Sequence, residues 1–219
     1  MSVDPVPNPS SAFLRARAQQ ILRPSLSLAD LEQAVPSSIS DDALDVRMSE
    51  LAVLAPWRPA AILLPIIDRP GGLTVLLTLR ASDLRAHSGQ VAFPGGKVDA
   101  GETPHLAALR EAQEEIGLEA RVVEPLGWLD PFFTGTGFRV APLVALIEPS
   151  FALTVNKLEV AEVFETPFAF LMDAANHHLE EREWAGRRRR YYAMPYEGRY
   201  IWGATAGILR NLFERLYSR

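Results

Sequence analysis

The strongest constraint on this chain is a run of glycine and charged residues between Gly96 and Leu118. Three glutamates, Glu111, Glu114 and Glu115, fall within five consecutive positions of that run. On a helix that turns roughly 100° per residue, Glu114 lies about 60° to one side of Glu111, and Glu115 lies about 40° to the other side. We therefore predict a helix that carries all three carboxylates on one face.

The ends of this helix are also readable. Thr103 is suited to the N-cap, Pro104 to the first turn, where its missing N–H costs nothing, and Gly117 to the C-terminal stop. The face opposite the glutamates is apolar and is predicted to pack into the core. It consists of Leu106, Leu109, Ala112 and Ile116.

Crowded carboxylates are unfavourable in a helix, because like charges at i,i+4 spacing destabilise it by about 0.2–0.5 kcal/mol per pair. Arg110 is the nearby cation and is placed to pair with Glu114. A hard divalent cation would relieve the repulsion better, since Mg²⁺ takes oxygen ligands and is usually held by a few carboxylates together with substrate phosphates. A solvated acidic face is the other interpretation.

The full spacing favours the metal interpretation. Residues 96–118 follow Gly-x5-Glu-x7-Arg-Glu-U-x-Glu-Glu-x-Gly-U, where U is a bulky apolar residue, and only Ala112 is smaller than usual. This pattern is the Nudix box, and the chain resembles a Nudix hydrolase. The resemblance implies an α/β fold, the Nudix fold, in which a mixed β-sheet is sandwiched between α-helices.

The resemblance also implies roles for single residues, with Mg²⁺ as the cofactor and Mn²⁺ as a substitute. Arg110 would orient the carboxylates, and Glu102 would brace the loop or join the outer metal shell. Family members often draw a further carboxylate, sometimes the general base, from a later segment, where the candidates are Glu159 and Glu162. The implied metal ligands are the side chains of Glu111, Glu114 and Glu115 and the backbone carbonyl of Gly95.

A second motif lies upstream of the box. Arg80 and Arg85 would leave a strand end beside the acidic helix, where guanidinium groups match phosphate oxygens, although each could also form a surface ion pair. Gly95 and Gly96 would shape the loop that follows, and with Arg80 and Arg85 they make up the predicted substrate-binding residues. The whole motif resembles the coenzyme A pyrophosphatase subgroup of Nudix enzymes through Leu76-Leu77-Thr78-Leu79-Arg80-Ala81, Arg85, His87-Ser88-Gly89-Gln90-Val91 and Phe93-Pro94-Gly95-Gly96.

The subgroup resemblance implies hydrolysis of the diphosphate bond of coenzyme A or acyl-coenzyme A to 3′,5′-ADP and (acyl-)4′-phosphopantetheine. Two alternatives stay open. One is a Nudix pyrophosphatase for another nucleoside diphosphate linked to a group X, such as ADP-ribose or a dinucleoside polyphosphate. The other is a Nudix-fold binding module without catalysis, although such modules usually lose box carboxylates that this chain keeps.

Composition limits the remaining choices. The chain has 219 residues, a formal net charge of −5 and no cysteine, so it lacks the basic character of a nucleic-acid binder and has no disulfide or thiolate metal site. It has no apolar run near the ~20 residues of a membrane span and no signal-peptide pattern at its start. We expect a cytoplasmic enzyme with a small-molecule substrate and no nucleic-acid or membrane partner. A homodimer is left open.

We divide the chain into an N-terminal arm and helical extension, residues 1–56, and a Nudix domain, residues 57–219. Phe132 and Phe133 could stack on an adenine ring or anchor a loop in the core. Pro142 predicts a sheet edge or a bulge. The expected helices cover residues 12–22, 28–35, 167–172 and 204–216, and the expected strands cover residues 60–67, 73–80, 121–129, 138–147 and 156–167, with a hairpin over 180–192.

Strand alternation in the segment 156–167 predicts which side chains share a face. Val160, Glu162 and Phe164 would lie on one side, with Ala161 and Val163 on the other.

Overall fold

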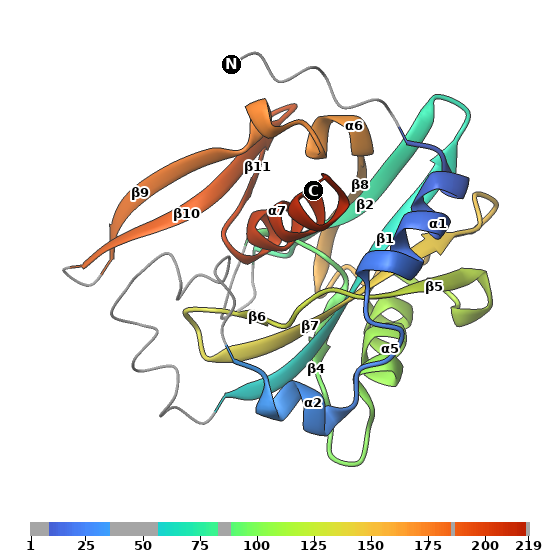
Figure 1. Ribbon diagram of the computed structural model, residues 1–219, viewed down its shortest axis with the longest axis horizontal. Helices are drawn as coiled ribbons and strands as arrows, with labels where there is room; N and C mark the ends of the chain where they lie inside the picture. Colours follow the sequence, from blue (N-terminus) through green and yellow to red (C-terminus); the bar gives the residue numbers. More distant parts are fainter. Residues whose placement is uncertain (1–8, 36–56, 83–88, 185–186, 218–219) are drawn as a thin grey trace.

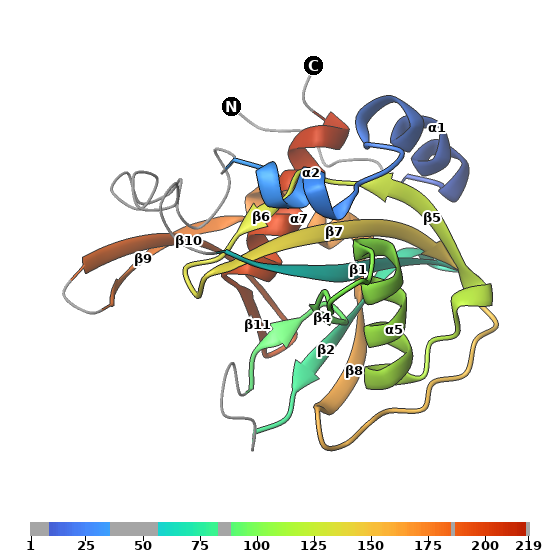
Figure 2. The ribbon, with the colours of Figure 1, turned by 90° about the horizontal axis from the view of Figure 1, so that it is seen from below.

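The computed structural model describes residues 9–35, 57–82, 89–184 and 187–217. Residues 1–8 and 36–56 of the predicted extension therefore lie outside the described residues. The predicted fold class is confirmed, because a mixed sheet lies between helices (Figures 1 and 2). Within the described residues, no helix is long and apolar enough to cross a membrane.

Eight strands form the central sheet: β1 (Arg58–Arg69), β2 (Gly72–Arg80), β3 (Val91–Ala92), β4 (Gly95–Lys97), β5 (Val123–Trp128), β6 (Phe132–Phe133), β7 (Phe138–Ile147) and β8 (Val160–Pro167). Their order is β3-β2-β1-β7-β5, with β4 paired to β1, β6 to β7 and β8 to β2. β1 and β7 run parallel and the other pairs are antiparallel. β1 is buried along most of its length, as its continuous apolar sequence predicts.

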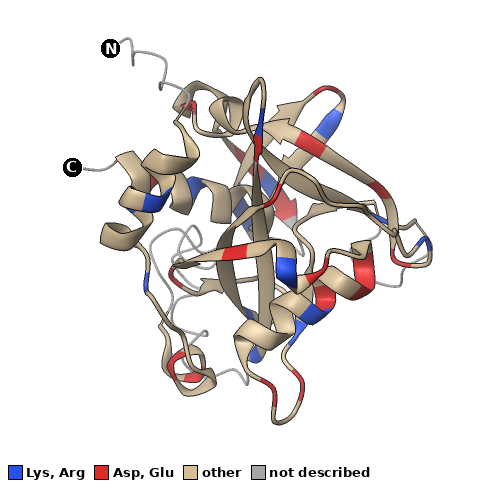
Figure 3. Ribbon diagram, turned by 90° about the vertical axis from the view of Figure 1, so that its right-hand side faces the viewer, with Lys and Arg blue, Asp and Glu red and all other residues tan. Residues whose placement is uncertain are grey.

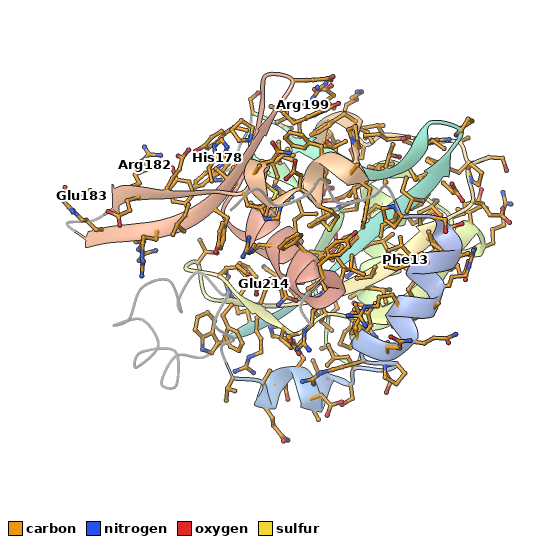
Figure 4. All side chains as sticks on the ribbon, turned by 45° about the horizontal axis from the view of Figure 1, so that its top comes forward. Phe13, His178, Arg182, Glu183, Arg199 and Glu214 are labelled. Atoms are coloured by element: carbon orange, nitrogen blue, oxygen red, sulfur yellow. The ribbon has the colours of Figure 1, made fainter. Side chains whose placement is uncertain are left out.

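A separate three-stranded sheet follows β8 in the chain. It has the order β11-β10-β9 and consists of β9 (His178–Trp184), β10 (Arg187–Tyr196) and β11 (Arg199–Trp202), so the predicted hairpin is confirmed. β9 and β10 extend away from the body of the molecule (Figure 1), and His178, Arg182 and Glu183 project from β9 (Figure 4).

The helices are α1 (Ser11–Ile21), α2 (Leu28–Gln33), α5 (Pro104–Ile116), α6 (Phe168–Leu171) and α7 (Ala204–Tyr217), with 3₁₀ turns at Ala120–Val122 and Ala174–Asn176. The predicted ends of α5 are confirmed. The hydroxyl of Thr103 accepts the Leu106 N–H at 3.3 Å, and Gly117 ends the helix at φ +71°, a left-handed conformation that glycine adopts without strain.

Two hydrophobic clusters lie on opposite sides of the sheet. One contains residues of α1, α6, α7 and β11, together with Leu77 and Phe164. The other contains the buried residues of α5, together with Leu31 of α2, Leu76 and Val160. Neighbouring residues such as Leu76 and Leu77 face opposite clusters because side chains alternate along a strand. The described part of the N-terminal extension thus contributes to both cores.

The predicted apolar stripe of α5 is partly wrong. Leu106 is 55% exposed and Leu109 is half-buried, whereas the buried face holds Ala107, Ala108, Ala112 and Ile116 and also includes Glu115. A face built mainly from alanines lets the helix lie close to the sheet, since alanine side chains are short. This close approach carries one carboxylate of the box under the sheet.

Two further predictions are decided by the sheet. Pro142 lies in β7, which runs between β1 and β5, so the edge prediction is wrong. On the side of β7 away from β1, Leu143 pairs with β5 and Val140 pairs with β6. Pro142 lies between them and has no paired residue on that side, so its missing N–H breaks no ladder hydrogen bond there. Phe132 and Phe133 are 2% and 0% exposed, so they anchor their loop in the core.

Candidate active site

The glycines before α5 are required by close packing. Gly95 has φ +156°, and a Cβ there would lie 2.5 Å from the carbonyl oxygen of Ala61 in β1. A Cβ on Gly96 would collide with the carboxylate of Glu111. Short strand β4 pairs with β1 through these residues, so the absence of side chains lets the helix carboxylates approach the sheet.

Arg110 forms ion pairs with three carboxylates of the box. Its guanidinium contacts carboxylate oxygens of Glu102 at 3.0 Å, Glu111 at 2.9 Å and Glu114 at 3.0 Å, and it donates to the carbonyl oxygen of Lys97 at 3.1 Å. The hydrogen bond from Arg110 lowers the pKa of Glu102. Figure 3 shows acidic and basic segments side by side on this part of the ribbon. Arg110 therefore pairs with Glu114, as the spacing of the two residues predicts.

Glu115 is in a different environment. It is only 3% exposed, and it accepts the Gly95 N–H at 3.2 Å and a long contact of 3.5 Å from Nη1 of Arg80. Burial raises the pKa of Glu115 to about 7, against the effects of Gly95 and Arg80, and the negative charges of Glu111 and Glu159 raise it further. The negative charge of the Glu115 carboxylate is therefore only partly balanced by the Gly95 N–H and the distant Arg80 guanidinium.

The other two box glutamates differ from Glu115. The side chain of Glu111 is 17% exposed, and burial raises its pKa despite the ion pair with Arg110, with further contributions from Glu114 and Glu159. The side chain of Glu114 is 56% exposed. The structure therefore brings Glu111 and Glu115 together under the sheet, while Glu114 lies at the surface and pairs with Arg110.

Glu159 is the carboxylate of the later segment that lies near these two, since its charge acts on both Glu111 and Glu115. It immediately precedes β8, and its backbone carbonyl accepts the N–H of Ala81 at 2.9 Å, just after the end of β2. Its Oε1 accepts Nδ2 of Asn156 at 3.0 Å.

Glu162 lies on the other side of the sheet. It pairs across the strands with Leu79, which faces the cluster of α7, and it forms an ion pair with Arg199 of β11, labelled in Figure 4. The predicted alternation holds for Val163 and Phe164, which face opposite clusters, but it is wrong for Val160, because the pairing passes from Leu79–Glu162 to Arg80–Val160. Ala161 is thus an extra residue, a bulge that turns Val160 towards α5. The structure does not bring Glu162 to the box glutamates.

The predicted substrate residues are only partly described. Arg80 lies at the site, 3.5 Å from Glu115, and its Nε is buried with no hydrogen-bond partner among the described residues. Arg85 and His87 lie outside the described residues. Sequence reasoning missed Asn156, because an asparagine in a turn has no distinguishing neighbour; its position three residues before Glu159 is the signal that could have found it.

A divalent cation fits the donor set at this place. The carboxylates of Glu111, Glu115 and Glu159 have oxygen atoms of the kind that Mg²⁺ prefers, and their burial and mutual repulsion leave negative charge that a cation would offset. In the arrangement described, Arg110 holds Glu111 and Glu114, and no three His, Cys, Asp or Glu side chains of the described residues form a ready metal cluster.

The NUDIX domain family model matches residues 56–186. This chain belongs to the Nudix family. Two relatives, each named uncharacterized Nudix hydrolase NudL, come from Yersinia pestis (strain Pestoides F) and Yersinia pseudotuberculosis (serotype O:1b, strain IP 31758). Each is 42% identical over 160 residues, which cover 73% of this chain and 80% of the relative.

Among solved structures, the Nudix hydrolase RenU from M. smegmatis has the same fold, with a TM-score of 0.50 and 24% identity. The match covers 72% of this chain and 84% of RenU. Nudix membership supports hydrolase activity on a nucleoside diphosphate linked to a further group, a small-molecule substrate, and the dependence on a divalent metal that is general in the family.

Proposed function

We propose that this Nudix protein hydrolyses the diphosphate bond of coenzyme A or acyl-coenzyme A. The products would be 3′,5′-ADP and (acyl-)4′-phosphopantetheine. The observation that carries the hydrolase assignment is the buried carboxylate of Glu115, held by Gly95 and flanked by the negative charges of Glu111 and Glu159. The coenzyme A assignment rests on the residues upstream of the box, from Leu76 to Gly96, which resemble the coenzyme A pyrophosphatase subgroup.

Arg80 supports a substrate with several phosphates. Its contact with Glu115 is long, at 3.5 Å, and its buried Nε has no acceptor among the described residues. A phosphate oxygen would supply that acceptor, since guanidinium groups bind phosphate through paired N–H donors. We assign Arg80 to substrate phosphate, and Arg85 to the same role on sequence grounds.

The diphosphate link resists hydrolysis because its charged oxygens repel a nucleophile. Divalent metal supplies charge neutralisation and a lower pKa of bound water, and Glu111, Glu115 and the carbonyl of Gly95 would hold it. Arg110 keeps Glu111 in position. The other box carboxylate, Glu114, would contribute to the same ion after it leaves Arg110.

We assign the proton acceptor to Glu159, because Glu162 faces the opposite side of the sheet. The negative charge of Glu159 would also strengthen the binding of a cation held by Glu111 and Glu115. Glu159 would accept the proton of the attacking water. As the water oxygen bonds to phosphorus, the bond from phosphorus to the bridging oxygen breaks, and that oxygen leaves on the second phosphate.

A substrate panel tests the assignment. The protein is incubated with coenzyme A, acetyl-coenzyme A, ADP-ribose and diadenosine tetraphosphate in oxygen-18 water with Mg²⁺, and the products are read by mass spectrometry. We expect the highest kcat/KM for coenzyme A or acetyl-coenzyme A, with the label in one of the two phosphate products. A preference for ADP-ribose or the dinucleotide would replace the substrate assignment. No turnover on the whole panel, with Mn²⁺ binding intact, would indicate a binding module.

A further inference from the structure

The segment from Thr154 to Glu159 closes the C-terminal end of α5. The last carbonyls of a helix have no partner within the helix. Here the N–H of Thr154 donates to the carbonyl oxygen of Ile116 at 2.9 Å, and the N–H of Asn156 donates to the carbonyl oxygen of Glu115 at 2.9 Å. The segment is therefore fixed against the helix turn that carries the buried carboxylate.

The side chain of Asn156 then holds the next turn of the chain. Its Oδ1 accepts the N–H of Leu158 at 3.2 Å, and its Nδ2 donates to Oε1 of Glu159 at 3.0 Å. The backbone carbonyl of Asn156 accepts the N–H groups of Glu159 at 3.0 Å and of Val160 at 2.9 Å. The amide and carbonyl groups of one residue thus define the turn that leads into β8.

Asn156 consequently joins two carboxylates of the site. Its main chain is bonded to the main chain of Glu115, and its side chain is bonded to the carboxylate of Glu159. A glutamate side chain has several rotatable bonds, and holding it in one conformation costs entropy that a fixed donor offsets in advance. The contact with Asn156 therefore determines where the Glu159 carboxylate lies before any ligand arrives.

We propose that Asn156 is a positioning residue, which holds the Glu159 carboxylate beside the turn of α5 that carries Glu115 and so strengthens divalent-cation binding at the site. The proposal rests on the proposed function for its effect on turnover, but the effect on cation binding is measurable without substrate. Partners in the outer shell of a metal site typically change its affinity or activity by about 10- to 100-fold when removed.

The test uses Asn156→Asp as the main variant. Aspartate keeps the size of the side chain and the Oδ1 acceptor for Leu158, but it has no N–H to donate to Glu159. Asn156→Ala removes both contacts without adding a charge. Lys157→Ala is the matched control, because Lys157 lies in the same turn and donates instead to the carbonyl oxygen of Ala161. Thermal unfolding verifies that each variant is folded.

Mn²⁺ affinity is measured by electron paramagnetic resonance on the substrate-free protein, and kcat and KM are measured on the substrate found in the panel. We expect both Asn156 variants to weaken Mn²⁺ binding about 10-fold. The fold-decrease in kcat should exceed the fold-change in KM. In a Glu159→Ala background, Asn156→Ala should have no further effect, since the group that Asn156 positions is gone.

Wild-type Mn²⁺ affinity in folded Asn156→Asp and Asn156→Ala would overturn the proposal, as would an equal loss in the Glu159→Ala background. Failure of the proposed function is distinguishable from both outcomes. It would appear as an absence of turnover in the wild-type protein, while the Mn²⁺ measurements would still test the role of Asn156.

Discussion

Among the described residues, each side of the central sheet buries one ionisable side chain. Glu115 belongs to α5 and is buried against β4, and His177 lies beside α7. Burial is the largest effect on both, and it raises the pKa of Glu115 and lowers the pKa of His177, in each case against the charged form. The difference between the two regions lies in the partners that surround each group.

His177 is fully engaged. Its Nε2 lies 2.7 Å from the carbonyl oxygen of Leu171, its Nδ1 lies 3.3 Å from Nη1 of Arg210, and its ring meets Phe213 edge-on at 5.1 Å. Glu115 has an N–H from Gly95 and a distant arginine, and it faces other carboxylates. A buried group with good partners stabilises the fold, whereas a buried charge without them indicates a place for a ligand.

Glu115→Gln should have the largest effect. We expect turnover to fall by more than about 100-fold, since even outer partners of a metal cost 10- to 100-fold. The free energy of unfolding of the metal-free protein should not fall at pH 8, because a neutral amide replaces a charge that the site disfavours. Steady-state kinetics and urea unfolding measure both. Glu119→Gln, at an exposed position paired with Arg121, is the control. Near-wild-type turnover of Glu115→Gln would show that the buried carboxylate is not needed for activity.

The second largest effect concerns Mg²⁺, which should stabilise the protein through Glu115 but not through His177. At about 100 times its dissociation constant, a cation that binds only the folded state raises the free energy of unfolding by about 2.7 kcal/mol. We expect this increase in the wild-type protein and in a His177→Ala variant, and little of it in Glu115→Gln. Urea unfolding with and without Mg²⁺ checks this. The same increase in Glu115→Gln would place the cation elsewhere.

His177→Ala should lower the free energy of unfolding by about 2 kcal/mol, because it leaves a cavity and removes the partners of Leu171 and Arg210. The kcat of the folded protein should stay unchanged. His178→Ala is the control, since His178 is the exposed neighbour. A loss of kcat in His177→Ala with unchanged stability would show that His177 serves activity and does not stabilise the fold.

The smallest effect concerns pH. Burial lowers the pKa of His177 in the folded protein below the value of about 6.5 in the unfolded chain. As pH falls below that value, the unfolded chain binds a proton more readily than the folded protein does, so stability is lost. The advantage of wild type over His177→Ala should therefore shrink, by at most about 1.4 kcal/mol per pH unit. Urea unfolding at pH 7, 6 and 5 measures it; a constant difference would contradict the burial argument.

The predictions that succeeded depend on neighbours in the chain. The ends of α5 follow from Thr103, Pro104 and Gly117, and β1 and β2 contain the two strands expected from apolar runs, which lie on either side of a Pro-Gly-Gly turn. Arg110 pairs with Glu114 one turn away, as its spacing predicts. Each of these features is decided within a few residues, where sequence gives direct information.

The predictions that failed depend on contacts between distant segments. One extra residue at Ala161 moved Val160 to the face opposite Glu162, because strand alternation holds only while pairing is regular. The buried face of α5 differs from the predicted one because the helix packs close to the sheet, which favours alanines over Leu106.

By itself, the sequence determined that a capped helix carries three glutamates and an arginine at fixed spacing, since helical geometry is set locally. Only the tertiary structure decided which glutamate is buried, which later carboxylate joins it and which faces away. Those outcomes depend on Gly95, Arg80 and Asn156, residues 20 to 41 positions from Glu115, which packing brings to one place. The charge of Glu115 is costly because of that packing, and the same packing supplies the neighbours with which it could bind a cation.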